Sequence, residues 1–74
     1  MLDFSKPMVV FGESRKVTFL AGPVDLRSGP RYVVYFEKTD DDDAYVGNVT
    51  QDGRICNPFG HWHKDFGLVI NASP

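Results

Sequence analysis

The stretch that decides the fold is RYVVYFEKTDDDDAYVGNVTQDGRICNPF, residues 31–59. It contains three runs rich in β-branched and aromatic residues, joined by an acidic segment and by the dipeptide Asp52-Gly53. Asp-Gly between two such runs is a strong hairpin signal, because a type I′ turn needs a positive φ at both central residues. The stretch therefore predicts a three-stranded antiparallel meander.

The expected loops also predict which residues oppose one another. A two-residue loop at Asp52 and Gly53 places Val49 opposite Cys56. A loop over residues 39–43 places Phe36 opposite Val46 and Tyr35 opposite Gly47, where the aromatic ring could cover the glycine. Directly opposed residues share a face of the sheet. One predicted face therefore holds Tyr32, Val34, Phe36, Val46 and Ile55 and could include Phe59, and the other holds Val33, Tyr35, Tyr45, Val49 and Cys56.

Both predicted faces are too apolar for a sheet with one side in water. Either the sheet curls so that its ends cover the second face, or another chain covers it. A second copy of the chain, forming a homodimer, would satisfy the second case.

The flanking segments add further strands. Residues 8–11 and 15–20 are expected to form a hairpin, residues 68–70 a closing strand, and residues 1–6 a frayed lead-in. Residues 21–30 contain two glycines and two prolines, so they predict a break, with residues 24–27 the only place for a helical turn. Five to six short strands predict an all-β single domain over residues 1–74. We expect a small antiparallel SH3-like barrel or a strongly curled meander.

Composition indicates the cellular compartment in which the protein is expected. The 74 residues are 42% hydrophobic, which argues against disorder. The single cysteine, Cys56, excludes an intramolecular disulfide and indicates a reducing compartment. No run approaches the ~20 apolar residues of a membrane span, and the first residues lack the pattern of a signal peptide. These features predict a cytoplasmic protein without membrane association.

Charge argues against nucleic acid as the first choice of partner. The net charge is −2, and no basic stripe is visible. A nucleic-acid-binding small barrel remains an alternative if the cations gather on one face, away from the aspartates. The cations concerned are Arg15, Lys16, Arg27 and Arg31.

Cys56, His61 and His63 could together bind zinc or copper. The paired ligand spacings of structural zinc sites are missing, so metal binding is a second alternative. The default interpretation makes Cys56 a small apolar filler and the histidines solvent-facing or satisfied in the core, with no metal or cofactor.

The acidic run Asp40, Asp41, Asp42 and Asp43 lacks the alternate ligand spacing and the glycine of a calcium loop. It is interpreted as a solvated hairpin tip, or alternatively as an acidic contact with a basic surface of a partner.

Trp62 lies between two histidines in a loop bounded by glycines, where an exposed aromatic residue would be a contact residue. No nucleophile motif or glycine-rich phosphate loop occurs. The sequence therefore predicts a non-enzymatic protein-interaction module, of the kind found among small accessory or inhibitor proteins of phages and mobile elements. The predicted partner-binding residues are Trp62, His61, His63, Asp40, Asp41, Asp42, Asp43, Tyr35 and Tyr45.

Overall fold

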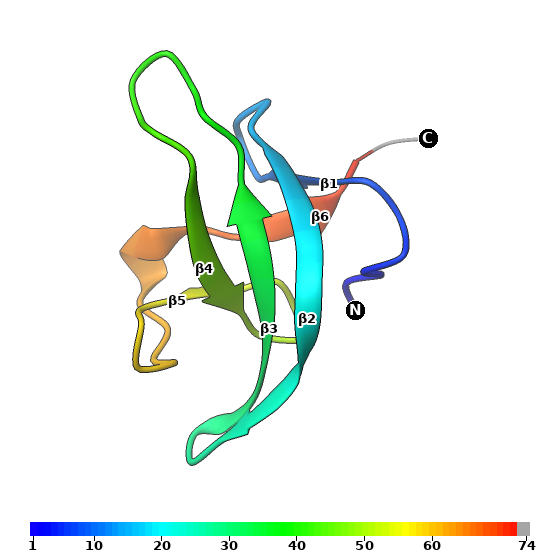
Figure 1. Ribbon diagram of the computed structural model, residues 1–74, viewed down its shortest axis with the longest axis vertical. Helices are drawn as coiled ribbons and strands as arrows, with labels where there is room; N and C mark the ends of the chain where they lie inside the picture. The colour runs from blue at the N-terminus through cyan, green and yellow to red at the C-terminus, as the bar shows by residue number, and fades with distance from the viewer. Residues whose placement is uncertain (73–74) are drawn as a thin grey trace.

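In the computed structural model, which describes residues 1–72, six antiparallel strands form one sheet. The elements are β1 (Met8–Val10), β2 (Lys16–Leu26), β3 (Gly29–Phe36), β4 (Tyr45–Val49), β5 (Ile55–Cys56), a 3-10 turn η1 (Lys64–Phe66) and β6 (Val69–Asn71). The order across the sheet is β5-β4-β3-β2-β1-β6, so β6 returns beside β1 after a five-stranded meander (Figure 1). The predicted all-β class is confirmed.

The sheet curls until its two edges meet at one point. Arg54, just before β5, forms an isolated antiparallel bridge with Leu68, just before β6. The N–H of Val69 donates to the carbonyl of Gly53 at 2.7 Å, and the N–H of Ile55 donates to the carbonyl of Gly67 at 3.1 Å. No continuous ladder joins the edges within residues 1–72, so the molecule is a strongly curled meander that stops short of a closed barrel.

The predicted break at residues 21–30 is wrong. These residues complete a long β2–β3 hairpin that closes with Leu26 opposite Gly29, and its register shifts twice, between Phe19 and Ala21 and between Ala21 and Val24. Such irregularities let a strand accommodate glycine and proline without ending.

Helix is confined to the single η1 turn within the described residues, but this turn lies at residues 64–66 and not at residues 24–27, the only place where the sequence analysis allowed one. The structure over residues 1–72 contains no helix that is long and apolar enough to span a membrane.

The predicted β3–β4 register is wrong by one residue. Phe36 faces Tyr45 and Tyr35 faces Val46. The N–H of Thr39 donates to the carbonyl of Asp42 at 2.9 Å, and the Thr39 hydroxyl accepts from the N–H of Asp42 at 3.0 Å. The loop therefore closes around a two-residue tip in place of the expected five-residue loop. A shift of one residue moves each side chain of β4 to the opposite face.

The β4–β5 register is shifted in the same way, with Val49 opposite Ile55. The loop consists of residues 51–53, and the N–H of Gly53 donates to the carbonyl of Thr50 at 2.9 Å. Gly53 has a φ of 91°, whereas no non-glycine residue among those described has a positive φ. This excludes the predicted type I′ turn at Asp52 and matches a three-residue loop that ends in a glycine bulge.

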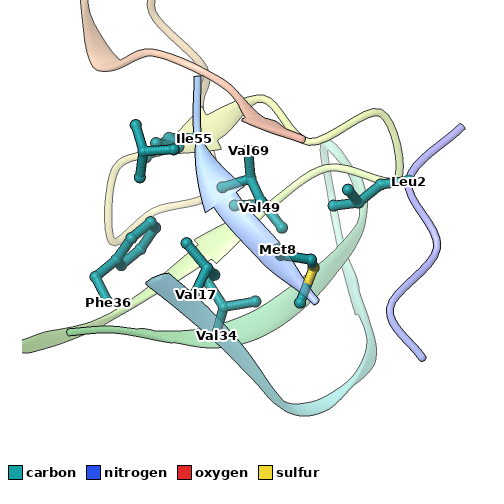
Figure 2. Packing of buried hydrophobic residues seen from close by; sticks show 9 residues of the cluster. Leu2, Met8, Val17, Val34, Phe36, Val49, Ile55 and Val69 are labelled. Atoms are coloured by element: carbon teal, nitrogen blue, oxygen red, sulfur yellow. The ribbon is translucent and has the colours of Figure 1, made fainter. Parts of the chain in front are cut away.

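The two shifts together build the core. Val49 joins Val34, Phe36 and Ile55 inside the curled sheet, with Val17, Met8 and Val69 from the other strands and Leu2 from the N-terminus (Figure 2). Val46, predicted to share a face with Phe36, is 60% exposed. An aromatic ring does cover Gly47, but the ring belongs to Phe36, because a Cβ at Gly47 would lie 2.8 Å from Phe36 Cε2.

The lead-in is anchored, contrary to the expectation that it frays. Leu2 is buried, and the ring of Phe4 stacks on that of Tyr32 with their centroids 4.2 Å apart. Asp3 and Asn71 exchange two hydrogen bonds, at 2.9 and 2.7 Å, which attach the lead-in to β6. The hydroxyl and N–H of Ser5 donate to the Asp3 carboxylate and lower the pKa of that group.

Candidate interaction surface

The chain between β5 and η1 contains a tightly hydrogen-bonded turn at residues 57–60, with the sequence NPFG. The N–H of Gly60 donates to the carbonyl of Asn57 at 2.9 Å. The Asn57 side-chain oxygen accepts from the N–H groups of Phe59 at 2.9 Å and His61 at 3.0 Å. Pro58 suits the second position of such a turn because its φ is already fixed. Three hydrogen bonds therefore constrain the backbone around Phe59.

Arg31 anchors this turn to the β2–β3 hairpin. Arg31 is buried, with 9% of the residue exposed, and its Nε donates to the carbonyl of Gly60 at 2.9 Å. The other guanidinium nitrogens donate to the carbonyls of Pro30 and Ser28 and to the Ser28 hydroxyl. Gly60 also packs against the Leu26 side chain so closely that a Cβ would collide with it. Arg31 is thus a structural residue of the surface.

Phe59 is presented to solvent by this anchored turn. The side chain is 79% exposed, whereas the sequence analysis allowed it on the predicted face that holds Phe36 and Ile55. The prediction fails because β5 ends at Cys56 and the turn at Pro58 redirects the chain. A residue this apolar held outward on a fixed backbone has the character of an interface anchor. Sequence reasoning missed it, although Asn-Pro followed by Gly was a readable turn signal.

Trp62 confirms the expectation of an exposed aromatic residue in this loop. It is 42% exposed, and it forms an isolated antiparallel bridge with Cys56, the last residue of β5. The Arg54 guanidinium lies over the indole ring, 4.8 Å from its centroid. Phe59 and Trp62 therefore project from the same loop, with one ring free and the other covered on one face by a cation.

The three residues of the metal alternative are not brought together. Cys56 is buried, while His61 and His63 are exposed. The Nδ1 atom of His63 accepts from the N–H of Asp65 at the start of η1. Within residues 1–72, no three side chains of the metal-ligating types converge on one point.

Arg15 holds the acidic hairpin loop. Its Nε donates to the carbonyl of Glu37 at 2.7 Å, and Nη2 donates to the carbonyl of Asp43 at 2.8 Å. Nη1 lies 3.7 Å from the Asp42 carboxylate, and the guanidinium lies over the Tyr45 ring. The side chains of residues 40–43 are exposed, as a solvated tip requires.

The four cations of the nucleic-acid alternative do not form one surface. Arg15 is buried against the acidic loop, and Arg31 is buried against the 57–60 turn. Lys16 and Arg27 are exposed, but the length of β2 separates them, because Lys16 begins this strand and Arg27 follows its last residue, Leu26. These four residues therefore do not provide one continuous basic face for phosphate contacts.

Tyr35 and Tyr45 were expected on one face and lie on opposite faces. Tyr45 stacks on Phe36 with 4.7 Å between the ring centroids. Tyr35 lies beside Val46 on the outward side of β3 and β4, and both are exposed.

The fold and this loop together define a small all-β domain that presents an anchored aromatic surface. Comparison of the chain with protein-family models, with curated proteins and with solved structures gives no match.

Proposed function

We propose that this chain is a non-enzymatic protein-interaction module that binds a partner protein through Phe59, His61 and Trp62. Its role would be that of a small accessory or inhibitor protein, with a cytoplasmic location suggested by its single unpaired cysteine. The observation that carries the proposal is the 57–60 turn, in which Asn57 and Arg31 hold the backbone while Phe59 remains 79% exposed.

Fixing the backbone before binding favours an interface, because less conformational freedom is lost when the partner arrives. A large exposed aromatic side chain on such a backbone contributes most when a partner pocket desolvates it. Removing Phe59 should therefore weaken binding while leaving the fold intact.

The test compares immobilised wild-type protein with the variants Phe59→Ala and Phe11→Ala as baits in a lysate of the source organism. Phe11 is the matched control, because it is also an exposed phenylalanine, at 65%, but lies after β1. We expect quantitative mass spectrometry to find a partner that Phe59→Ala loses and Phe11→Ala retains. Equal thermal melting of the variants verifies folding. Captured proteins that are the same for both variants, or no captured protein, would refute the proposal.

The proposal includes self-association through the outward side of β3 and β4. Val46 and Tyr35 leave an apolar strip there that the curled sheet does not cover. Light scattering over a concentration range measures the mass in solution. A constant monomer mass would remove the homodimer and leave partner binding at Phe59 in place.

A further inference from the structure

A shallow hollow of about 310 Å³ is lined by Arg27, Ser28, Phe59 and His61. It lies between the tip of the β2–β3 hairpin and the 57–60 turn, which the Arg31 guanidinium holds together. Phe59 and His61 also belong to the surface assigned to partner binding above. The hollow adds to that surface the exposed residue Arg27, which carries a positive charge.

The positive charge around this hollow is not neutralised. Neither Arg27 nor Arg31 forms an ion pair within residues 1–72, and Asp25, the carboxylate of the same hairpin, pairs with neither. Every hydrogen bond of Arg31 goes to a carbonyl or hydroxyl oxygen, so the guanidinium is satisfied but keeps its charge. Arg15, at the other end of β2, differs because Asp42 lies beside it.

The Phe59 ring lies beside cations that have no ion-pair partner among the described residues, and this combination determines which ligand the hollow can bind. A low-dielectric surface with one sign of charge focuses the electrostatic potential on a ligand of the opposite sign. His61 adds an imidazole that can donate a hydrogen bond, and the Phe59 ring offers apolar contact.

We propose that the hollow accepts an acidic side chain of the partner protein, next to an apolar side chain that packs on Phe59. The proposal rests on the proposed function and specifies the chemistry of its partner. A carboxylate of a protein is favoured over a nucleic-acid backbone. One exposed arginine suits a single anion, while the net charge of −2 and the dispersed cations give a run of phosphates little attraction.

The experiment starts with a displayed library of random 12-residue peptides, selected on the folded wild-type protein. We expect the enriched peptides to carry aspartate or glutamate next to an aromatic or aliphatic residue. Fluorescence anisotropy of one enriched peptide should then show affinity reduced tenfold or more by Arg27→Glu. A peptide with lysine in place of its acidic residue should recover affinity for that variant, because complementary charges are restored.

The matched control is Lys38→Glu, which makes the same charge change at an exposed cation near the acidic loop. Equal weakening by both variants would assign the effect to net charge and overturn the proposal. Enriched peptides that lack acidic residues, or a selection that enriches no peptide, would also overturn the proposal.

Two further outcomes separate this inference from the proposed function. A 20-nucleotide oligothymidine that displaces the peptide and also loses affinity with Arg27→Glu would reassign the hollow to nucleic acid. If Phe59→Ala abolishes partner capture and Arg27→Glu leaves it unchanged, the interaction module stands and the acidic specificity fails.

Discussion

At the scale of single residues, two buried arginines fix the loops that the strands leave exposed. Arg15 donates to the carbonyls of Glu37 and Asp43, and Arg31 donates to that of Gly60. A guanidinium has five donors in a fixed plane, so one side chain can satisfy several loop carbonyls that no strand pairs. Both residues were candidates for phosphate binding in the sequence, and both instead determine how the loops are presented.

The glycine at residue 53 gives a prediction at this scale. A Cβ there would collide with the backbone carbonyl of Val69, and the φ of 91° disfavours any other residue. The strain of left-handed backbone alone costs about 1–2 kcal/mol. Because the collision adds to this strain, Gly53→Ala should lower the free energy of unfolding by more than that amount. Urea denaturation followed by circular dichroism measures the loss.

Gly12→Ala is the control for Gly53→Ala. Gly12 has a similar φ of 82°, but a Cβ there meets no atom within 4 Å. It should show the cost of the strain without the collision. Equal losses for the two variants would mean that β6 does not approach the 51–53 loop as described.

At the scale of elements, the register of two hairpins decides which side chains form the core. Both hairpin loops differ in length from the expected loops, since one closes around residues 40–41 and the other consists of residues 51–53. Each difference shifts the strand pairing by one residue. Because side chains alternate along a strand, this exchanges the two faces of β4. Val49 thereby enters the core and Val46 leaves it.

The register can be tested by a pair of alanine substitutions. Phe36→Ala should cost about 3–5 kcal/mol of unfolding free energy, because it removes a fully buried ring. Val46→Ala should change the free energy of unfolding by no more than about 0.5 kcal/mol, as at other exposed positions. Both losses are measured by urea denaturation. A loss above about 1.5 kcal/mol for Val46→Ala would restore the register in which Val46 opposes Phe36.

At the scale of the whole molecule, the chain places different chemistry at its two ends. The acidic loop, residues 40–43, lies at one end of the long axis, and the β2–β3 hairpin tip with Arg27 lies at the other (Figure 1). The N-terminal lead-in lies along the curled sheet between them, where Leu2 and Phe4 pack on the core. The hydrogen bonds between Asp3 and Asn71 attach the lead-in to β6, so the N-terminal segment lies beside the last strand of the sheet.

Deletion of residues 2–5 tests this attachment. It removes the buried Leu2 side chain, which contributes about 1.5–3 kcal/mol, and the Phe4–Tyr32 stack. The melting temperature should fall by about 10 °C or more, as followed by circular dichroism. Lys6→Ala is the control, since its exposed pair with Asp3 should be worth less than about 1 kcal/mol. An unchanged melting temperature for the deletion would mean that the lead-in frays in solution.

The sequence predicted the elements better than the interactions between them. The strand at β1, the start of β2, the 31–36 run and the closing strand are found where their alternation and turn residues placed them. The exposed Trp62 was also predicted, from its polar neighbours and flanking glycines. The anchored Phe59 was missed, because the turn that presents it is held by Arg31, which donates to Gly60 from 29 residues earlier in the chain.

What the sequence by itself determined is local: β propensity, the positions of the turns, and the absence of a basic stripe. Each of these depends on the conformational preference or charge of neighbouring residues. Only the tertiary structure decided the two registers, the roles of Arg15 and Arg31, and the direction of Phe59. Those features depend on contacts between segments far apart in sequence. A one-residue difference in where a loop closes exchanges the buried and exposed faces of a strand, and the amino-acid composition of the loop hardly indicates it.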